Sequence, residues 1–284
     1  MTNAELLTTF VAAYPAQPAT AYWRAIEIGA VLRYGLPDGF GLDLGCGDGI
    51  LTDILLAHAG PRTLVGIDVD PLEAAAAEKF PFYERVHAAP ANAIPEPDCT
   101  FDFVLSSSVL EHIPDLEGTI AETARVLRGG GRFLLTVPTA AFHRNLRGPL
   151  TPGIARSHYL ETLDRRLAHY HYLSAADWSI LLARHGMTLD ANLGYFDQRE
   201  TRRWESLSRV TGGLFYSIFR QAGRPIEIQR SLGMRGLQNS TSLPRPLASA
   251  LGKIISLGAS VDQNLNLWLD KDISSCLLVA ARKK

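Results

Sequence analysis

A glycine-rich turn between a short apolar run and a helix constrains this chain most. Phe40–Leu44 is apolar and ends in Gly45-Cys46-Gly47-Asp48-Gly49, after which Leu51 and Ile54 begin a helical pattern. Glycine permits a left-handed backbone and lets a ligand approach the main chain. The free amides at the start of a helix favour a negative group. The segment therefore predicts a strand–turn–helix unit that binds an anionic ligand.

Strands alternate with helices along most of the chain, which is typical of an α/β fold with a mostly parallel sheet. The predicted strands are Phe40–Leu44, Thr63–Ile67, Arg85–Ala88, Phe101–Leu105, Arg132–Val137, Leu189–Phe196 and Ser275–Ala281. The predicted helices cover residues 4–13, 20–35, 74–79, 116–127 and 174–185, and a further helical stretch runs through Leu51, Ile54 and Leu55. Ser174 is the expected N-cap of the last helix.

Composition excludes several classes of protein. Hydrophobic residues make up 46% of the 284 residues and charged residues 20%, which indicates a soluble globular chain. We expect no membrane-spanning helix and no signal peptide, because no apolar stretch reaches about 18 residues and no basic segment precedes one at the N-terminus. The well-separated Cys46, Cys99 and Cys276 fit a reducing compartment, so we expect a cytoplasmic location.

The charges are balanced overall and uneven along the chain. With 28 basic and 29 acidic residues the net charge is −1, which gives no support to nucleic-acid binding. Residues 197–284, however, hold 14 basic and 7 acidic side chains. This end of the chain is a candidate for an anionic substrate or a membrane surface, and an ordinary solvated face is the alternative.

An acid follows the second predicted strand. Asp68 comes directly after Val65-Gly66-Ile67, where a carboxylate can hydrogen-bond both hydroxyls of a ribose. The glycine turn does not suit a pyrophosphate, because Ile50 stands where a dinucleotide fingerprint has its third glycine and Asp43 precedes the turn. S-adenosylmethionine satisfies both conditions, since its carboxylate can take the loop amides and its ammonium can face an acid.

Taken together, these motifs resemble the class I S-adenosylmethionine-dependent methyltransferases, specifically the type 11 small-molecule family. The resemblance implies a doubly wound, Rossmann-like sheet of order 3-2-1-4-5-7-6 with strand 7 antiparallel. His169, Leu173-Ser174 and Gly186-Met187 also follow the family's pattern before its sixth strand. The segments that match in family order are Leu42–Gly49, Val65–Asp68, Ile94-Pro95, Phe101–Val104, Val109–His112 and Arg125–Gly130.

The resemblance also implies how S-adenosylmethionine is held. The glycine turn takes the methionine portion, with Asp43 beneath it near the ammonium, and Asp68 takes the ribose hydroxyls. Pro90 replaces the family's usual acceptor for the adenine amino group, which leaves Asn92 or a backbone carbonyl to accept from it. The cofactor-binding residues implied are Asp43, Gly45, Cys46, Gly47, Gly49, Asp68, Val69, Ala91, Asn92 and Ser106.

Methyl transfer requires a positioned, desolvated nucleophile, and a general base only where the acceptor's proton has a high pKa. His112 is the first candidate base, because it follows the fourth strand at the edge that borders the ligand crevice in such sheets. The alternative is a hydrogen-bonded histidine at a helix start. Glu111 is expected to be a helix-terminus acid. His143 and His169 are the other candidate catalytic residues.

The polar segment 139–172 holds four of the eight histidines and is predicted to be loop plus helix. Three interpretations remain open: a lid over the acceptor, a structural polar network, and a metal site. His169 and His171 have no cysteine or carboxylate partner at ligand spacing, so we assign no metal ligand.

A long excursion separates the sixth and seventh predicted strands. We expect a helical N-terminal cap (1–36), a catalytic domain (37–196 and 271–284) and a helical insertion (197–270). The insertion contains the apolar patch 212–219. It could be helices docked on the catalytic domain, an interfacial element at the inner face of the membrane, or a homodimer interface. One apolar helical stripe is predicted from Leu247, Leu251, Ile254, Gly258, Val261, Leu265 and Trp268.

The predicted function is in-line methyl transfer from S-adenosylmethionine to a small-molecule or lipid-linked acceptor. A saccharide, a lipid-linked glycan and a secondary metabolite are the candidate acceptors, and oxygen is the favoured nucleophile. Two alternatives stand beside it: a regulator or scaffold that binds S-adenosylmethionine without turnover, and an enzyme of different chemistry on the same fold.

Overall fold

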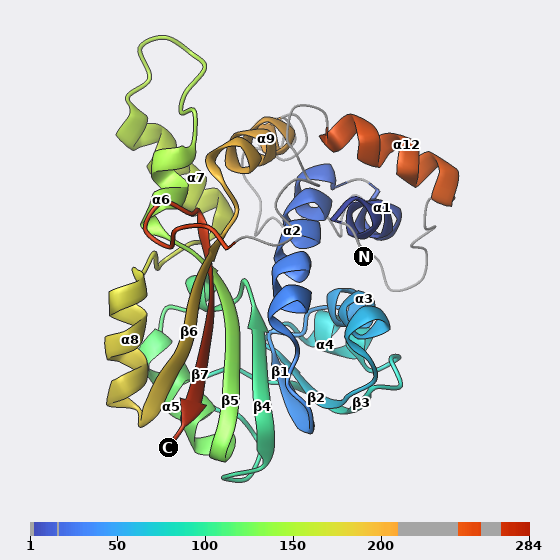
Figure 1. The fold of residues 1–284 in the computed structure, drawn as a ribbon, viewed down its shortest axis with the longest axis vertical. Coiled ribbons are helices and arrows are strands. Elements are labelled where there is room, and N and C mark those ends of the chain that lie inside the picture. The colour runs from blue at the N-terminus through green and yellow to red at the C-terminus, as the bar shows by residue number, and fades with distance from the viewer. Residues whose placement is uncertain (1–2, 16, 210–243, 257–267) are drawn as a thin grey trace. The chain divides into compact units, whose positions relative to one another are not determined.

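The computed structural model describes residues 3–15, 17–209, 244–256 and 268–284 (Figure 1). The chain divides into two compact units. The helical unit comprises 1–29, 142–169 and 196–267, and the sheet unit comprises 30–141, 170–195 and 268–284. The three-part division expected from the sequence stays a prediction.

A seven-stranded sheet of order β3-β2-β1-β4-β5-β7-β6 forms the sheet unit. β7 runs antiparallel to both β5 and β6, whereas the other neighbours are parallel. The predicted strand order and the antiparallel seventh strand are therefore confirmed. The strands are β1 (Phe40–Leu44), β2 (Thr63–Asp68), β3 (Tyr83–Ala88), β4 (Phe101–Ser107), β5 (Leu127–Pro138), β6 (Met187–Tyr195) and β7 (Cys276–Lys283).

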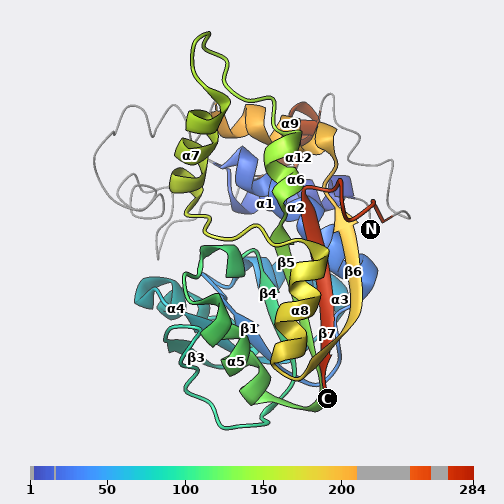
Figure 2. The ribbon, with the colours of Figure 1, turned by 90° about the vertical axis from the view of Figure 1, so that its left-hand side faces the viewer.

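Helices cover both faces of this sheet. α5 and α8 lie side by side on one face, and α3 lies on the other (Figures 1 and 2). Ser174 caps α8 as predicted, in a reciprocal capping box with Asp177. The helices of this unit are α3 (Ile50–Ala59), α4 (Pro71–Ala77), the 3-10 helix η1 (Leu110–His112), α5 (Leu116–Val126) and α8 (Ala175–Arg184).

The central strands are buried on both faces, which explains their continuous apolar runs. Leu42, Val104 and Leu135 are among the fully buried residues of the core cluster. Because β1, β2 and β4 are parallel, their carboxyl ends meet at one edge of the sheet. The core thereby fixes the glycine turn, Asp68 and Ser106 at that edge.

β5 begins earlier than the sequence indicates. We predict its start at Arg132, but it starts at Leu127, which pairs with Phe101 before a register shift moves the pairing to Arg132 and Phe103. Gly130, with φ 78°, lies in the irregular stretch between these pairs. The glycines therefore form a bulged start to the strand, where the sequence suggests a separate turn.

An aromatic cluster forms the core of the helical unit. The Trp23 ring lies 4.7 Å from that of Phe196, 5.6 Å from Trp204 and 5.8 Å from Phe142, measured between centroids. α6 and α7 confirm the loop-plus-helix prediction for 139–172. The helices are α1 (Asn3–Ala13), α2 (Pro18–Tyr34, which continues into the sheet unit), α6 (Ala140–Asn145), α7 (Arg156–Leu167), α9 (Gln198–Ser208) and α12 (Arg245–Ser256).

The buried face of α12 differs from the predicted stripe. Leu247 and Ile254 are 49% and 58% exposed, whereas Ala248 and Ile255 are buried. α12 packs against α1, and a Cβ on Gly252 would lie 3.6 Å from Thr8, so small residues permit close helix contact and decide the face. The patch 212–219 and the stripe residues Gly258, Val261 and Leu265 lie outside the described residues. Within the described ranges, no helix has the length and apolar character to cross a membrane.

Candidate functional site

The glycine turn is held against the second strand. The amides of Gly45 and Cys46 both donate to the carbonyl oxygen of Ile67, at 2.8 and 2.9 Å. Gly45 has a φ of 82°, and a Cβ there would lie 2.4 Å from Val109 Cγ2, so only glycine fits. Around Gly47, by contrast, the nearest atom to an added Cβ is Glu73 Oε2, 3.8 Å away. The turn thus presents its backbone to open space at Gly47.

Gly49 completes the turn. It precedes α3 with a φ of 81°, and a Cβ there would lie 2.6 Å from the Phe80 ring. The three predicted glycines therefore have different reasons to be glycine. Gly45 packs too closely for a side chain, Gly47 leaves space beside the backbone, and Gly49 adopts a left-handed backbone conformation as the N-cap of α3.

Asp68 is pinned to the turn through its carboxylate. Its Oδ2 accepts from the Gly47 amide and its Oδ1 from the Asp70 amide, each at 2.9 Å. Both oxygens of a carboxylate can accept more than one hydrogen bond, so these bonds are compatible with a ribose diol as well. Val69 follows directly and is 65% exposed, an apolar surface beside the carboxylate.

Asp43 lies beneath the turn in a buried network. Its Oδ2 accepts from the Thr52 hydroxyl and the Tyr83 hydroxyl, both at 2.5 Å. Burial raises the pKa of the Asp43 carboxyl, and the two hydroxyl donors oppose that rise. Asp43 is therefore held in place by two hydroxyl donors, and its position beneath the methionine portion and its contact with the ammonium stay predictions. The sequence gives no signal for Thr52 or Tyr83.

Two further predicted residues are buried near the same edge. Burial raises the pKa of the Cys46 thiol, which favours its protonated form, and its contact with the cofactor stays a prediction. Ser106 is fully buried near the carboxyl end of β4, and its hydroxyl has no hydrogen-bond partner among the described residues. An orphaned buried hydroxyl is unusual in a folded protein. A Ser106 hydroxyl on the floor of the predicted cofactor site could hydrogen-bond a ligand instead.

The loop after β3 carries Ala91 and Asn92. Asn92 donates its side-chain amide to Asp115 Oδ2 at 2.7 Å, and this bond holds the pKa of the Asp115 carboxyl below its usual range. Arg125 fastens the same loop by donating to the carbonyl oxygens of Ile94 and Glu96, each at 2.8 Å. Sequence reasoning missed this clamp. The adenine contacts of Ala91 and Asn92 stay predictions.

His112 and Glu111 lie together in η1, after β4. Glu111 is buried and its Oε1 lies 3.9 Å from His112 Nε2, while the His112 side chain is 40% exposed. Glu111 lies in the first turn of η1, which agrees with the helix-terminus acid expected from the sequence. The next helix, α5, is capped by Asp115, whose side chain accepts from the Gly118 amide. An accessible imidazole backed by a buried carboxylate can take up a proton.

His143 and His169 belong to the helical unit. Both rings lie near Phe142, with centroid distances of 6.1 and 6.3 Å. His143 Nε2 is 2.8 Å from Asp164 Oδ1. The structure thus brings these two histidines together around one aromatic ring, and the His143–Asp164 pair favours the polar-network interpretation of 139–172. Their catalytic roles stay predictions.

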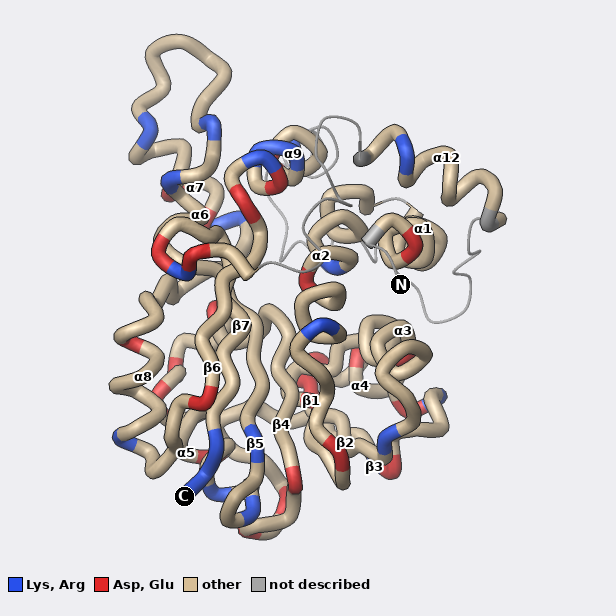
Figure 3. Tube along the Cα trace, viewed as in Figure 1, with Lys and Arg blue, Asp and Glu red and all other residues tan. Residues whose placement is uncertain are grey.

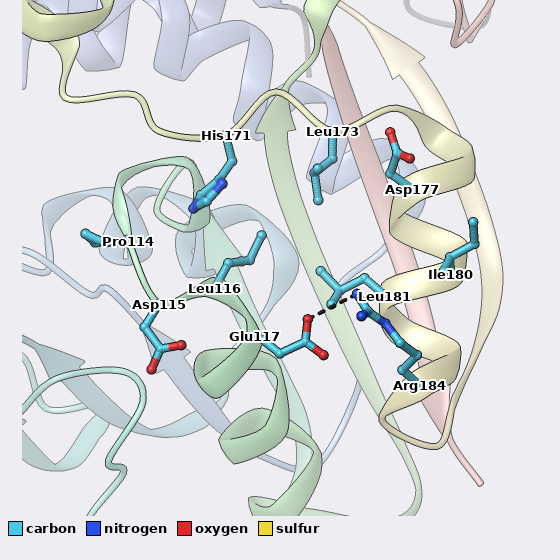
Figure 4. A pocket seen from close by; sticks show the side chains of 10 residues that line it. All are labelled: Pro114, Asp115, Leu116, Glu117, His171, Leu173, Asp177, Ile180, Leu181 and Arg184. Atoms are coloured by element: carbon cyan, nitrogen blue, oxygen red, sulfur yellow. Dashed lines mark ion pairs between the residues drawn. The ribbon is translucent and has the colours of Figure 1, made fainter.

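A separate cavity of about 430 Å³ lies between α5 and α8 (Figure 4). Leu116, Leu173 and Leu181 line it, and the Glu117–Arg184 ion pair spans 3.1 Å between its two helices. His171 also lines it and approaches the Ile113 carbonyl oxygen at 2.9 Å. None of the predicted cofactor or catalytic residues lines this cavity.

Part of the chain is similar to known proteins. Residues 42–135 match the family model described as "Methyltransferase domain". The chain is 32% identical over 158 residues to a protein of Mycolicibacterium smegmatis named a probable S-adenosylmethionine-dependent methyltransferase, covering 55% of this chain and 54% of that protein. It is 29% identical over 175 residues to a ubiquinone biosynthesis O-methyltransferase of Sinorhizobium fredii, covering 57% and 65%.

The fold recurs in solved structures. One is phosphoethanolamine N-methyltransferase 2 of Haemonchus contortus in complex with S-adenosyl-L-methionine, with a TM-score of 0.53 and 16% identity over 90% of this chain and 52% of that one. At this identity the likeness shows the fold alone. The chain spans about half the length of the first curated relatives that it matches.

Proposed function

Because residues 42–135 belong to the class I S-adenosylmethionine-dependent methyltransferases of the type 11 family, we propose that the chain transfers a methyl group to an oxygen of a small-molecule acceptor. The observation that carries the proposal is the Asp68 carboxylate, held 2.9 Å from the Gly47 amide beside the exposed Val69. This edge offers an acceptor for a ribose diol, an open glycine backbone and an apolar surface for an adenine.

The residues present fit S-adenosylmethionine. The space at Gly47 that a Cβ would enter, and the orphaned buried hydroxyl of Ser106, are both features that a ligand would complete. When bound, S-adenosylmethionine supplies the electrophilic methyl group. Asp68 would hold its ribose hydroxyls and the glycine turn its methionine portion, while Val69 would pack on its adenine.

The chain's own contribution to the chemistry is to position the acceptor and to take its proton. His112 Nε2 is the group that would accept a hydroxyl proton, since it is exposed and follows β4 at the edge where the cofactor residues gather. Glu111 would act through His112 as a positioning residue, because its buried carboxylate stabilises the imidazolium that results.

The acceptor is proposed to be an oxygen nucleophile on a saccharide, a lipid-linked glycan or a secondary metabolite. Support for oxygen comes from the relative named as a ubiquinone biosynthesis O-methyltransferase. We propose a cytoplasmic location, which the wide separation of Cys46, Cys99 and Cys276 along the chain supports. Contact of the 197–270 insertion with a membrane surface or a second copy belongs to the same proposal.

The test is methyl transfer from labelled S-adenosylmethionine to a panel of phenols, saccharides and lipid extracts. His112→Asn is expected to lower kcat by about a hundredfold or more and to leave cofactor affinity unchanged, because it removes only the base. His58→Asn, on the exposed surface of α3, is the matched control and should keep full activity.

Three outcomes would contradict parts of the proposal. Full activity of His112→Asn would remove the base assignment and leave methyl transfer standing. Tight cofactor binding without a methylated product from any acceptor would favour the regulator or scaffold. Conversion of an acceptor without label transfer would favour a different chemistry on the same fold.

A further inference from the structure

We propose that the loop joining α6 to α7, residues 146–155, is a membrane-contact element that seats its tip in an anionic lipid surface. We call residues 149–154 the tip of this loop. The inference rests on the surface chemistry of the helical unit and holds whether or not the chain transfers methyl groups.

The tip presents apolar side chains to solvent. Leu150 is 76% exposed and Ile154 is 42% exposed. The loop projects away from α6 and α7 in both views (Figures 1 and 2). Pro149 and Pro152 restrict the backbone at the tip, which keeps both apolar side chains displayed at little entropic cost. Exposure of these apolar side chains to water is unfavourable, and their transfer into the acyl boundary of a bilayer lowers the free energy.

The base of the loop is rigid. The buried Glu205 carboxylate accepts from the amides of Arg147 and Gly148, at 2.8 and 3.2 Å. Arg156 closes the other limb by donating to the carbonyl oxygens of His143 and Leu146, at 2.7 and 3.0 Å. These bonds fix both limbs on α6 and α9. The exposure of the tip is therefore a property of the fold.

Positive charge surrounds this projection. Basic residues occupy both limbs of the loop and the two ends of α7 (Figure 3). Arg156 donates to carbonyl oxygens, and no carboxylate pairs with it among the described residues, so its charge remains uncompensated. Of the two acids in the segment, Glu161 pairs with Arg165. Residues 142–169 contain Arg144, Arg147, Arg156, Arg165 and Arg166 against Glu161 and Asp164.

The combination fits a lipid surface better than a protein partner. A specific protein interface buries roughly 800 Å² on each side, far more than two apolar side chains provide. A bilayer needs no complementary shape. Each arginine near an anionic leaflet adds roughly 1 kcal/mol of attraction, and two inserted aliphatic side chains add a hydrophobic anchor. The positive charge of these arginines therefore favours anionic lipid headgroups as the partner of the tip.

The test is flotation of the full chain with vesicles of phosphatidylcholine alone and of phosphatidylcholine with roughly one third phosphatidylglycerol. We expect binding to the anionic vesicles that weakens as salt is raised. Leu150→Asp with Ile154→Asp should lower partitioning about tenfold or more. The matched control, Leu72→Asp with Ile180→Asp, carries the same two residue types on exposed positions of α4 and α8 in the sheet unit and should keep it. Leu247→Asp with Ile254→Asp, on α12, tests the 197–270 insertion in the same assay.

A charge variant separates the two sources of binding. Arg147→Gln should lower partitioning to anionic vesicles about fivefold and leave the neutral ones unchanged. Lys271→Gln, an exposed cation of the sheet unit, should have no effect. The tip is exposed, so the variants should fold, and an unchanged thermal unfolding midpoint verifies this.

No binding of the intact chain to anionic vesicles would overturn the inference. Loss of binding in the α12 variant with retention in the tip variant would also overturn it and would assign membrane contact to the 197–270 insertion. Neither result bears on methyl transfer, which is measured without vesicles, so the two proposals fail separately.

Discussion

Removing the Asp68 carboxylate should affect cofactor binding and folding by different and separable amounts. Asp68 accepts one hydrogen bond from the Gly47 amide and one from the Asp70 amide before any ligand arrives. Asp68→Ala therefore costs about 2 kcal/mol of folding stability, at about 1 kcal/mol for each bond. In the complex it also loses two bonds from the ribose hydroxyls to a charged acceptor, at about 1.5 kcal/mol each or more.

The second loss sets the expected affinity. About 3 kcal/mol corresponds to a rise of roughly 150-fold in the dissociation constant for S-adenosylhomocysteine, measured by titration calorimetry. Asp68→Asn should fall between Asp68→Ala and the parent, because the amide keeps one acceptor oxygen and loses the charge. The dissociation constants are measured well below the thermal unfolding midpoint of each variant, so that differences in folding stability do not affect them.

Asp70→Ala is the matched control. Asp70 caps α4 by accepting from the Leu72 amide, and its own amide still donates to Asp68 in the variant. It should lose about 1 kcal/mol of stability and keep its affinity. An affinity for Asp68→Ala within threefold of the parent, despite a lower unfolding midpoint, would refute the placement of the ribose.

Two other substitutions test residues that support the site. Gly45→Ala should lower the free energy of unfolding by about 3 kcal/mol, measured in urea, because its Cβ would lie 2.4 Å from Val109 Cγ2 at a positive φ. Gly129→Ala is the control and should cost far less, since nothing lies within 4 Å of its Cβ. Equal losses in the two variants would contradict this reasoning. Arg85 pairs with Glu96 through two bonds of 2.7 Å and holds the pKa of the Glu96 carboxyl below its ordinary 4.5. A lowered folded-state pKa gives stability that is present above the unfolded pKa and lost as the pH falls through the folded one, so Glu96→Gln should cost about 1 kcal/mol at neutral pH and little under strongly acidic conditions. A gap that persists in acid would show that the ionised carboxylate is not its source.

The positions of the central strands could be predicted because each is an apolar run with a clear end, whereas the strand order followed from the resemblance to a known family. β1 matches its predicted bounds, and β2 extends one residue beyond its own. Its end at Asp68 is also the basis of the prediction that this carboxylate accepts from a ribose. Local patterns failed where pairing between strands decides the outcome, as at Leu127, which joins β5 only through its partner Phe101.

The site could be predicted only as far as single segments allow. The glycine turn and Asp68 follow two consecutive parallel strands, β1 and β2, so their proximity follows from one strand–helix–strand unit. The partners of Asp43 do not follow, since Thr52 lies on α3 and Tyr83 on β3, and the stacking of β1, β2 and β3 alone brings them together. The prediction of the buried face of α12 was wrong for a related reason. Contact with α1 favours the small Ala248 and Gly252 over larger apolar residues.

Hydrogen exchange with and without S-adenosylhomocysteine tests the cofactor site most directly. The account predicts slower exchange of the amides from Gly45 to Gly49 and of Asp68 to Asp70 when the ligand is bound, with the amides of α8 unchanged. Ligand binding that leaves the glycine turn unprotected, or that protects the α5–α8 cavity instead, would contradict the account.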